Sequence, residues 1–215
     1  MSENQFGTQY DVSKKSRLKK FYEGNKILIF STILFLVIAI VSVGIYSETK
    51  KKKKILLAEN YISAKVYLKK NDKDEAANIL KAIIFANDKT YSSLSLFLIL
   101  NNNLISDHEE LSNLFDHVIE NNKFDKETRN LIIFKKAIFQ SNFVDESVLI
   151  ELLKPLINTE TIWKPHALLL LGDYFVSKQE FLKAKEFYTR ILSLQNLNKK
   201  MYERARVQLE LIAND

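Results

Sequence analysis

A single apolar run constrains this chain more than any other feature. The twenty residues from Ile27 to Tyr46 contain no charged side chain. An α-helix rises about 1.5 Å per residue, so the run would be about 30 Å long, the thickness of the hydrocarbon core of a bilayer. Its polar residues are Ser31, Thr32 and Ser42, whose hydroxyls can hydrogen-bond to carbonyls of their own helix inside lipid. A transmembrane helix is therefore predicted at 27–46.

Two other interpretations of the run remain open. A cleaved signal peptide has an apolar stretch of about 7–15 residues followed by a small-residue cleavage site. The run here is longer, and the sequence SETKKKKK follows it. A helix that is apolar on all sides can also be a buried core helix, although such helices normally carry more polar residues. The aromatic residues at its two ends, Phe21, Tyr22 and Tyr46, suit a membrane interface and favour a span.

Basic residues flank the run on both sides. Six lysines and arginines lie within residues 14–26, and five lysines form the run Lys50–Lys54. Positive residues favour the cytoplasmic side, so the charge count alone does not decide the orientation. The sequence predicts four segments: a basic cytoplasmic tail at 1–26, a transmembrane helix at 27–46, a lysine-rich juxtamembrane linker at 47–54 and a helical domain at 55–215.

The net charge of +6 is unevenly distributed. Residues 1–54 hold 11 Lys/Arg and 4 Asp/Glu, whereas residues 55–215 hold 21 and 22. The domain is therefore close to neutral, which argues against nucleic-acid binding. The chain has no cysteine, and this excludes disulfides, thiol catalysis and cysteine metal sites.

Apolar residues recur at helical spacing throughout the domain, and short polar stretches separate the helices. Asp72 or Asp74 can cap the second helix. The last helix is expected to bury Tyr202, Ala205 and Leu209. The predicted helices cover the apolar stripes at 56–68 and 76–84 and the segments 90–101, 107–121, 126–140, 145–157, 163–177, 181–194 and 199–213. This pattern predicts an all-α fold in which the transmembrane helix is followed by antiparallel helix pairs.

One segment carries a repeat signature. Leu168-x2-Leu171-Gly172-x2-Phe175 is followed by Phe181, Ala184-x3-Tyr188 and Ile191. This pattern over 165–198 resembles the tetratricopeptide signature, in which small residues such as Gly172 and Ala184 allow two helices to approach closely. A weaker copy lies at 57–90 with Ala64 in place of the glycine, and 91–160 is interpreted as two degenerate pairs. The resemblance implies a tetratricopeptide-like α-solenoid; an irregular helical bundle is the alternative.

No motif indicates an enzyme. The three histidines, His108, His117 and His166, are too far apart in sequence to form a metal-binding pair on one helix. No nucleophile-elbow, Walker or Rossmann pattern occurs. We therefore expect no catalytic residue, no metal and no cofactor.

Arrays of helical pairs bind partners on a concave surface that the first helix of each pair lines. Seven residues on these helices are candidates for protein binding, and they form no charge cluster suited to clamping a carboxylate tail: Tyr61, Lys65, Leu68, His166, Leu169, Asp173 and Val176. Their mixture of apolar and aromatic groups suits extended or partly folded polypeptide.

The span at 27–46, the lysine-rich connection and the repeat at 165–198 together resemble the bacterial ancillary subunit of the Sec translocon, the YfgM-type family of single-pass inner-membrane proteins. That resemblance implies a cytoplasmic N-terminus and a periplasmic domain. It also implies association with the Sec translocon and a membrane-anchored periplasmic chaperone, and assistance to exported proteins, with no nucleic acid and no small-molecule substrate. Two alternatives are a structural adaptor that bridges cell-envelope complexes without binding clients, and a cytosol-facing receptor on an organelle membrane.

Overall fold

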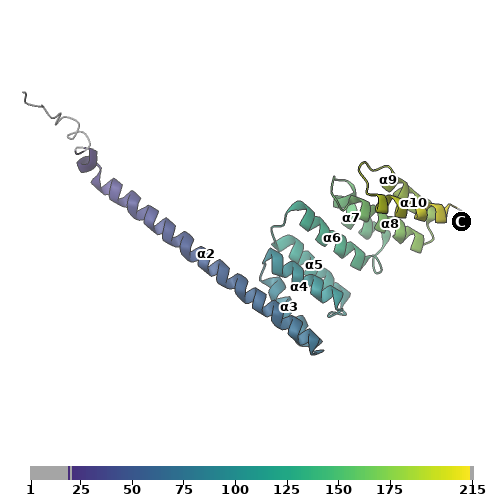
Figure 1. Cartoon of the computed structure of the whole chain (residues 1–215), viewed down its shortest axis with the longest axis horizontal. Coiled ribbons are helices and arrows are strands. Elements are labelled where there is room, and N and C mark those ends of the chain that lie inside the picture. The colour runs from purple at the N-terminus through teal and green to yellow at the C-terminus, as the bar shows by residue number, and fades with distance from the viewer. Residues whose placement is uncertain (1–18, 20, 214–215) are drawn as a thin grey trace, which may run out of the picture. The chain divides into compact units, whose positions relative to one another are not determined.

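The computed structural model describes Lys19 and residues 21–213 (Figure 1). Most of the expected basic tail, residues 1–18 and Lys20, lies outside the described residues, as do residues 214–215. Every regular element in the described part of the chain is an α-helix, so the all-α prediction is confirmed. The helices are α2 (Lys26–Lys69), α3 (Lys73–Phe85), α4 (Lys89–Asn101), α5 (His108–Asn121), α6 (Lys126–Gln140), α7 (Glu146–Ile157), α8 (Lys164–Ser177), α9 (Phe181–Leu192) and α10 (Lys199–Ile212).

Helix α2 contains the apolar run. It is long enough and apolar enough to cross a membrane, and its most apolar window has a mean hydropathy of 2.8 with no residue buried inside the protein. The hydroxyls of Ser31 and Thr32 donate to the carbonyl of Leu28 at 2.9 and 2.8 Å. These bonds satisfy the polar groups within the helix itself, as a lipid environment requires.

The lysine-rich segment 47–54, expected as a linker, is helical throughout and lies within α2. The chain divides into two units between Ile55 and Leu56. We refer to residues 56–215 as the helical domain. Leu57 and Ala64, near the end of α2, are buried in it, and the ring of Tyr61 lies 6.2 Å from the ring of Tyr91 on α4.

Within the helical domain, each helix from α3 to α10 contacts the next one in chain order, and Figure 1 shows these helices side by side. Two further contacts join α3 to α5 and α8 to α10. Aspartate side chains begin several helices, because a carboxylate accepts from the free N–H groups of a first turn. Asp72 caps α3 as predicted, Asp88 caps α4, Asp107 caps α5 and Asp125 caps α6.

Three helices end in the same kind of turn. Asn71, Asn103 and Gln179 have positive φ angles of 63°, 49° and 59°. In each case the next N–H donates to a carbonyl five residues earlier, as Asp72 does to Tyr67 at 3.0 Å. This is the Schellman motif, which normally uses glycine in the left-handed position. Asparagine, which tolerates that conformation, replaces glycine at two of these three turns in a domain whose one glycine is Gly172.

The core of the domain is a continuous layer of aliphatic and aromatic side chains between successive helices. Gly172 on α8 and Ala184 on α9 are both buried, and the backbone of α8 at Gly172 lies directly against the ring of Tyr188. On α10, Ala205 is buried, but the expected burial of Tyr202 is wrong: its side chain is 42% exposed. Met201, one residue earlier, occupies the buried position instead.

Candidate functional site

Hydrogen bonds at their N-terminal ends tie α6 and α8 together. The Trp163 indole N–H donates to the carbonyl of Glu127 at 3.1 Å, and the Thr161 hydroxyl donates to Oε2 of the same residue at 2.6 Å. The Trp163 ring also stacks on Phe134 at a centroid distance of 5.7 Å. These contacts fix the spacing of two helices whose side chains line one pocket.

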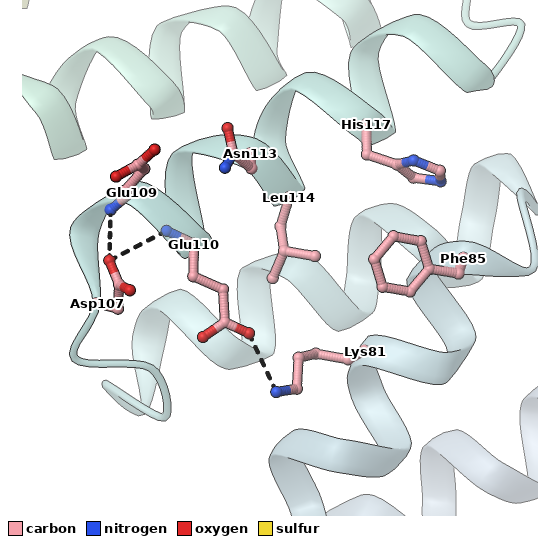
Figure 2. A pocket seen from close by; sticks show the side chains of 8 residues that line it. All are labelled: Lys81, Phe85, Asp107, Glu109, Glu110, Asn113, Leu114 and His117. Carbon is pink, nitrogen blue, oxygen red and sulfur yellow. Dashed lines mark hydrogen bonds and ion pairs between the residues drawn. The ribbon is translucent and has the colours of Figure 1, made fainter.

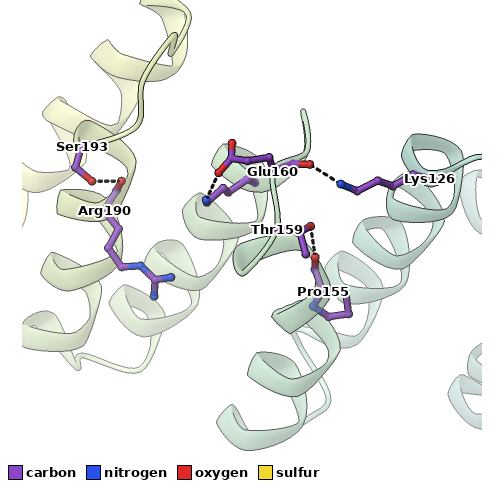
Figure 3. A network of polar contacts seen from close by, with 7 residues as sticks. Lys126, Pro155, Thr159, Glu160, Arg190 and Ser193 are labelled. Atoms are coloured by element: carbon purple, nitrogen blue, oxygen red, sulfur yellow. Dashed lines mark hydrogen bonds and ion pairs between the residues drawn. The ribbon is translucent and has the colours of Figure 1, made fainter.

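A second set of contacts holds the connection between α7 and α8, as Figure 3 shows. The ammonium of Lys126 donates to the carbonyl of Glu160 at 2.7 Å, and Lys164 donates to the Glu160 carboxylate at 2.8 Å. The hydrogen bond from Lys164 lowers the pKa of Glu160 from its usual value. Thr159 completes the end of α7 by donating to the carbonyl of Pro155 at 2.7 Å.

The pocket formed by α6, α8 and α10 has a volume of about 450 Å³. We call it the α6–α8–α10 pocket. Its apolar lining comes from Phe134, Ile138, Leu169, Leu170 and Met201. Its polar lining comes from His166, Asp173, Asn198, Lys200 and Arg204. An apolar floor with a few polar groups at its edge is the usual make-up of a ligand-binding cavity.

Three of the seven predicted binding residues meet in this pocket. They are His166, Leu169 and Asp173, which follow one another along α8 at helical spacing. Leu169 is buried and forms part of the floor. His166 packs against the rings of Phe134 and Trp163, and its Nδ1 is buried without a hydrogen-bond partner among the described residues. A ligand with a donor or acceptor at that depth would satisfy this nitrogen.

Asp173 is the most highly connected residue of the pocket. Its Oδ1 accepts from the Tyr188 hydroxyl of α9 at 2.7 Å, and its Oδ2 accepts from Nη2 of Arg204 on α10 at 3.2 Å. Burial and the hydrogen bond to Asp173 raise the pKa of Tyr188 far above its usual value. The carboxylate therefore joins three helices at the pocket.

The other predicted binding residues lie elsewhere. Tyr61, Lys65 and Leu68 are on α2, and none of them lines the α6–α8–α10 pocket. Tyr61 is half-buried against Tyr91, and this burial raises the pKa of its phenol. Val176 is on α8 and half-buried, also outside the lining.

Sequence reasoning missed the contributions of α6 and α10. Phe134 and Ile138 lie in a segment whose repeat signature is degenerate, and Lys200 and Arg204 lie on a helix for which only buried residues were predicted. The i, i+4 spacing of Lys200 and Arg204 places them on one helix face, which was the available signal.

A different pocket, of about 490 Å³, lies between α3 and α5 and is shown in Figure 2. Glu110 pairs with Lys81 across it at 3.1 Å, and Asp107 accepts from the N–H groups of Glu109 and Glu110. The ring of His117 stands edge-on to Phe85 at 4.7 Å. The carboxylates of Asp107 and Glu110 are therefore engaged in capping and pairing.

In the described residues, no group of three His, Asp or Glu side chains is placed to hold a metal ion. Comparisons with protein families, with curated proteins and with solved structures find no match to this chain.

Proposed function

We propose that this chain is a single-pass membrane protein whose helical domain is a tetratricopeptide-like array that binds extended polypeptide in the α6–α8–α10 pocket. Three features support the array: successive helices pack in chain order, α3–α5 and α8–α10 contacts link neighbouring pairs, and the same Schellman turn ends α2, α4 and α8. In such arrays the first helices of successive pairs line one surface. With pairs α6–α7 and α8–α9, the first helices are α6 and α8, and α10 follows in the position of the next first helix.

The observation that carries the binding proposal is the lining of that pocket. Apolar side chains from three different helices converge on one cavity, and polar groups surround it. Main-chain amides and apolar side chains of an extended peptide would find both kinds of partner there. Ile138, which lines this cavity, is 41% exposed, so a partner can reach it.

The cellular setting is proposed from the resemblance to the YfgM-type family. The protein would lie in the cell inner membrane with its N-terminus in the cytoplasm and its domain in the periplasm. It would associate there with the Sec translocon and a membrane-anchored periplasmic chaperone, and assist exported proteins. A reporter that fluoresces only in the cytoplasm, fused after Asp215, should stay dark; fluorescence at the membrane would reverse the orientation.

Site-specific photo-crosslinking in cells tests the binding proposal. A photoreactive residue at Ile138, in the pocket, should capture polypeptide partners. The matched control is Leu182 on α9, an aliphatic side chain that is 87% exposed and does not line the pocket. Equal labelling from both positions would contradict the pocket as the binding site. Mass spectrometry of the adducts then separates many exported clients from one constant partner, and a single constant partner would favour the structural adaptor.

A further inference from the structure

The two cations at the edge of the α6–α8–α10 pocket are a local departure from the charge of the domain. Residues 55–215 are close to neutral, yet Lys200 and Arg204 stand one turn apart on the same face of α10. Lys200 has no hydrogen-bond or ion-pair partner in the part of the chain that the structure describes. An unpaired ammonium beside an apolar floor attracts a ligand that carries a negative charge next to an apolar group.

The one carboxylate of the pocket does not cancel this charge. Asp173 faces Arg204 at 3.2 Å, with side chains that are 37% and 57% exposed. An exposed pair of this kind is weak. The Arg204 guanidinium has five N–H donors, and Asp173 engages one of its nitrogens, so donors are left for a second carboxylate. Asp173 would keep its hydrogen bond from Tyr188 if Arg204 turned toward a ligand.

We infer that the pocket selects polypeptide segments in which an apolar residue adjoins an acidic one. The apolar side chain occupies the floor formed by Phe134, Leu169 and Met201, and the carboxylate binds Lys200 and Arg204. Asp173 repels the ligand carboxylate and attracts Arg204, so it lowers the affinity. This inference rests on the proposed polypeptide binding and names the chemistry of the partner.

Three capped peptides of equal length, with the same uncharged fluorophore, provide the test. Leucines alternate with glutamate in the first, with glutamine in the second and with lysine in the third. Binding is measured by fluorescence anisotropy to the full chain in nanodiscs of zwitterionic lipid, with protein-free nanodiscs as the blank. We expect the glutamate peptide to bind most tightly and the lysine peptide least tightly.

Variants of α10 assign the charge preference to the pocket. Lys200→Gln and Arg204→Gln should each weaken binding of the glutamate peptide by about fivefold, the effect of losing one exposed ion pair, and weaken binding of the glutamine peptide by less. The matched control is Arg206→Gln on the same helix, because Arg206 pairs with Glu203 and Glu210 and does not line the pocket. Asp173→Asn should have the opposite effect and tighten binding of the glutamate peptide, since it removes the competing charge.

The outcomes separate this inference from the proposed function. The preference for acidic segments is overturned if all three peptides bind equally, or if Arg206→Gln weakens binding as much as Arg204→Gln does. In either case, loss of peptide binding in Ile138→Glu would still support the pocket as the binding site. If Asp173→Asn weakens the glutamate peptide, the competition is overturned. If no peptide binds, or Ile138→Glu has no effect, the proposed polypeptide binding itself fails.

Discussion

The Tyr188 hydroxyl on α9 donates a 2.7 Å hydrogen bond to Oδ1 of Asp173 on α8. Tyr188 is fully buried, so its phenol needs a partner inside the protein. The same ring lies against Gly172, one residue before Asp173. One side chain thus fixes both the spacing of α8 and α9 and the position of a carboxylate at the edge of the proposed binding pocket.

Tyr188→Phe should lower the free energy of unfolding of the helical domain. The ring still fits, but the hydrogen bond to a carboxylate is lost, and such a bond contributes about 1–2 kcal/mol. Chemical denaturation followed by circular dichroism measures the change. The control is Tyr202→Phe, because Tyr202 is exposed on α10. A similar loss in both variants would contradict a specific role for the buried phenol.

Gly172→Ala should also destabilise the domain, although alanine is the better helix former by about 1 kcal/mol. A Cβ at this position would lie 2.8 Å from Cδ1 and Cζ of Tyr188, far inside van der Waals contact. Overpacking of a core costs about 1–3 kcal/mol, so the clash should outweigh the propensity. Gly172→Leu should cost more. In a Tyr188→Leu background, which lacks the ring, Gly172→Ala should lower the unfolding free energy by less than it does in the native protein. If the effects of the two substitutions simply added, this contact would be contradicted.

The ion pair between Lys136 on α6 and Asp116 on α5 should respond asymmetrically to mutation. The ammonium donates to both carboxylate oxygens at 2.6 and 2.7 Å, and the lysine side chain is only 9% exposed. Asp116→Ala leaves a buried charge unpaired and should cost about 1–2 kcal/mol of unfolding free energy, whereas Lys136→Met should stay within about 1 kcal/mol of the native value. Thermal unfolding of the two variants measures this difference in stability.

A surface pair offers the comparison for that experiment. Lys154 and Glu151 form an exposed ion pair on α7 at 2.9 Å. Glu151→Ala should change the stability by no more than about 0.5 kcal/mol, since exposed pairs contribute little. If Lys136→Met were as damaging as Asp116→Ala, the loss would reflect the pair itself rather than an unpaired buried charge.

The Schellman turn at Asn103 predicts an unusual ranking of substitutions. Its φ of 49° is left-handed, a region that costs residues such as alanine about 1–2 kcal/mol and costs glycine nothing. Asn103→Ala should therefore lower the unfolding free energy by about 1 kcal/mol, and Asn103→Gly should leave it nearly unchanged. Asn113→Ala, at an exposed helical position of α5, is the control and should not lower the unfolding free energy, because alanine is the better helix former. A neutral Asn103→Ala would mean that the turn has another conformation.

The hydrogen bonds of Asp125 predict that its carboxylate contributes to the pH dependence of stability. The hydroxyl and the N–H of Thr128 both donate to its carboxylate and hold the pKa of Asp125 below its usual value. A lowered folded-state pKa stabilises the protein above the unfolded value, about pH 4, and this contribution is lost as the pH falls through the folded value. Asparagine at position 125 can still cap the helix but does not titrate. The melting temperature of Asp125→Asn should therefore fall less than that of the native protein between about pH 6 and pH 3. Asp145→Asn, at a cap position without a side-chain bond, should not have this effect.

Local features of the sequence predicted much of the helical domain. The helix predicted at 126–140 is α6, and the one at 163–177 differs from α8 by one residue at its start. Aspartates mark the starts and short polar stretches mark the ends, and both act within one turn of chain. Burial on α10 was harder to predict. Tyr202 and Met201 are adjacent apolar residues, and which of them is buried depends on the angle at which α10 packs against α9 and α8.

By itself, the sequence determined the apolar run and, to within two residues, the limits of α4 to α10, because hydrophobic length, periodicity and capping are properties of neighbouring residues. It did not show that α2 continues without a break through 47–54. Only the tertiary structure decided the composition of the α6–α8–α10 pocket. Its lining combines Ile138, Leu169 and Arg204, and each is more than 30 residues from the next in the sequence. They come together because the helices that carry them pack against one another. The state of Asp173 was decided in the same way: it was predicted as a binding residue, and its hydrogen bond from Tyr188 and its ion pair with Arg204 exist because three helices converge on it.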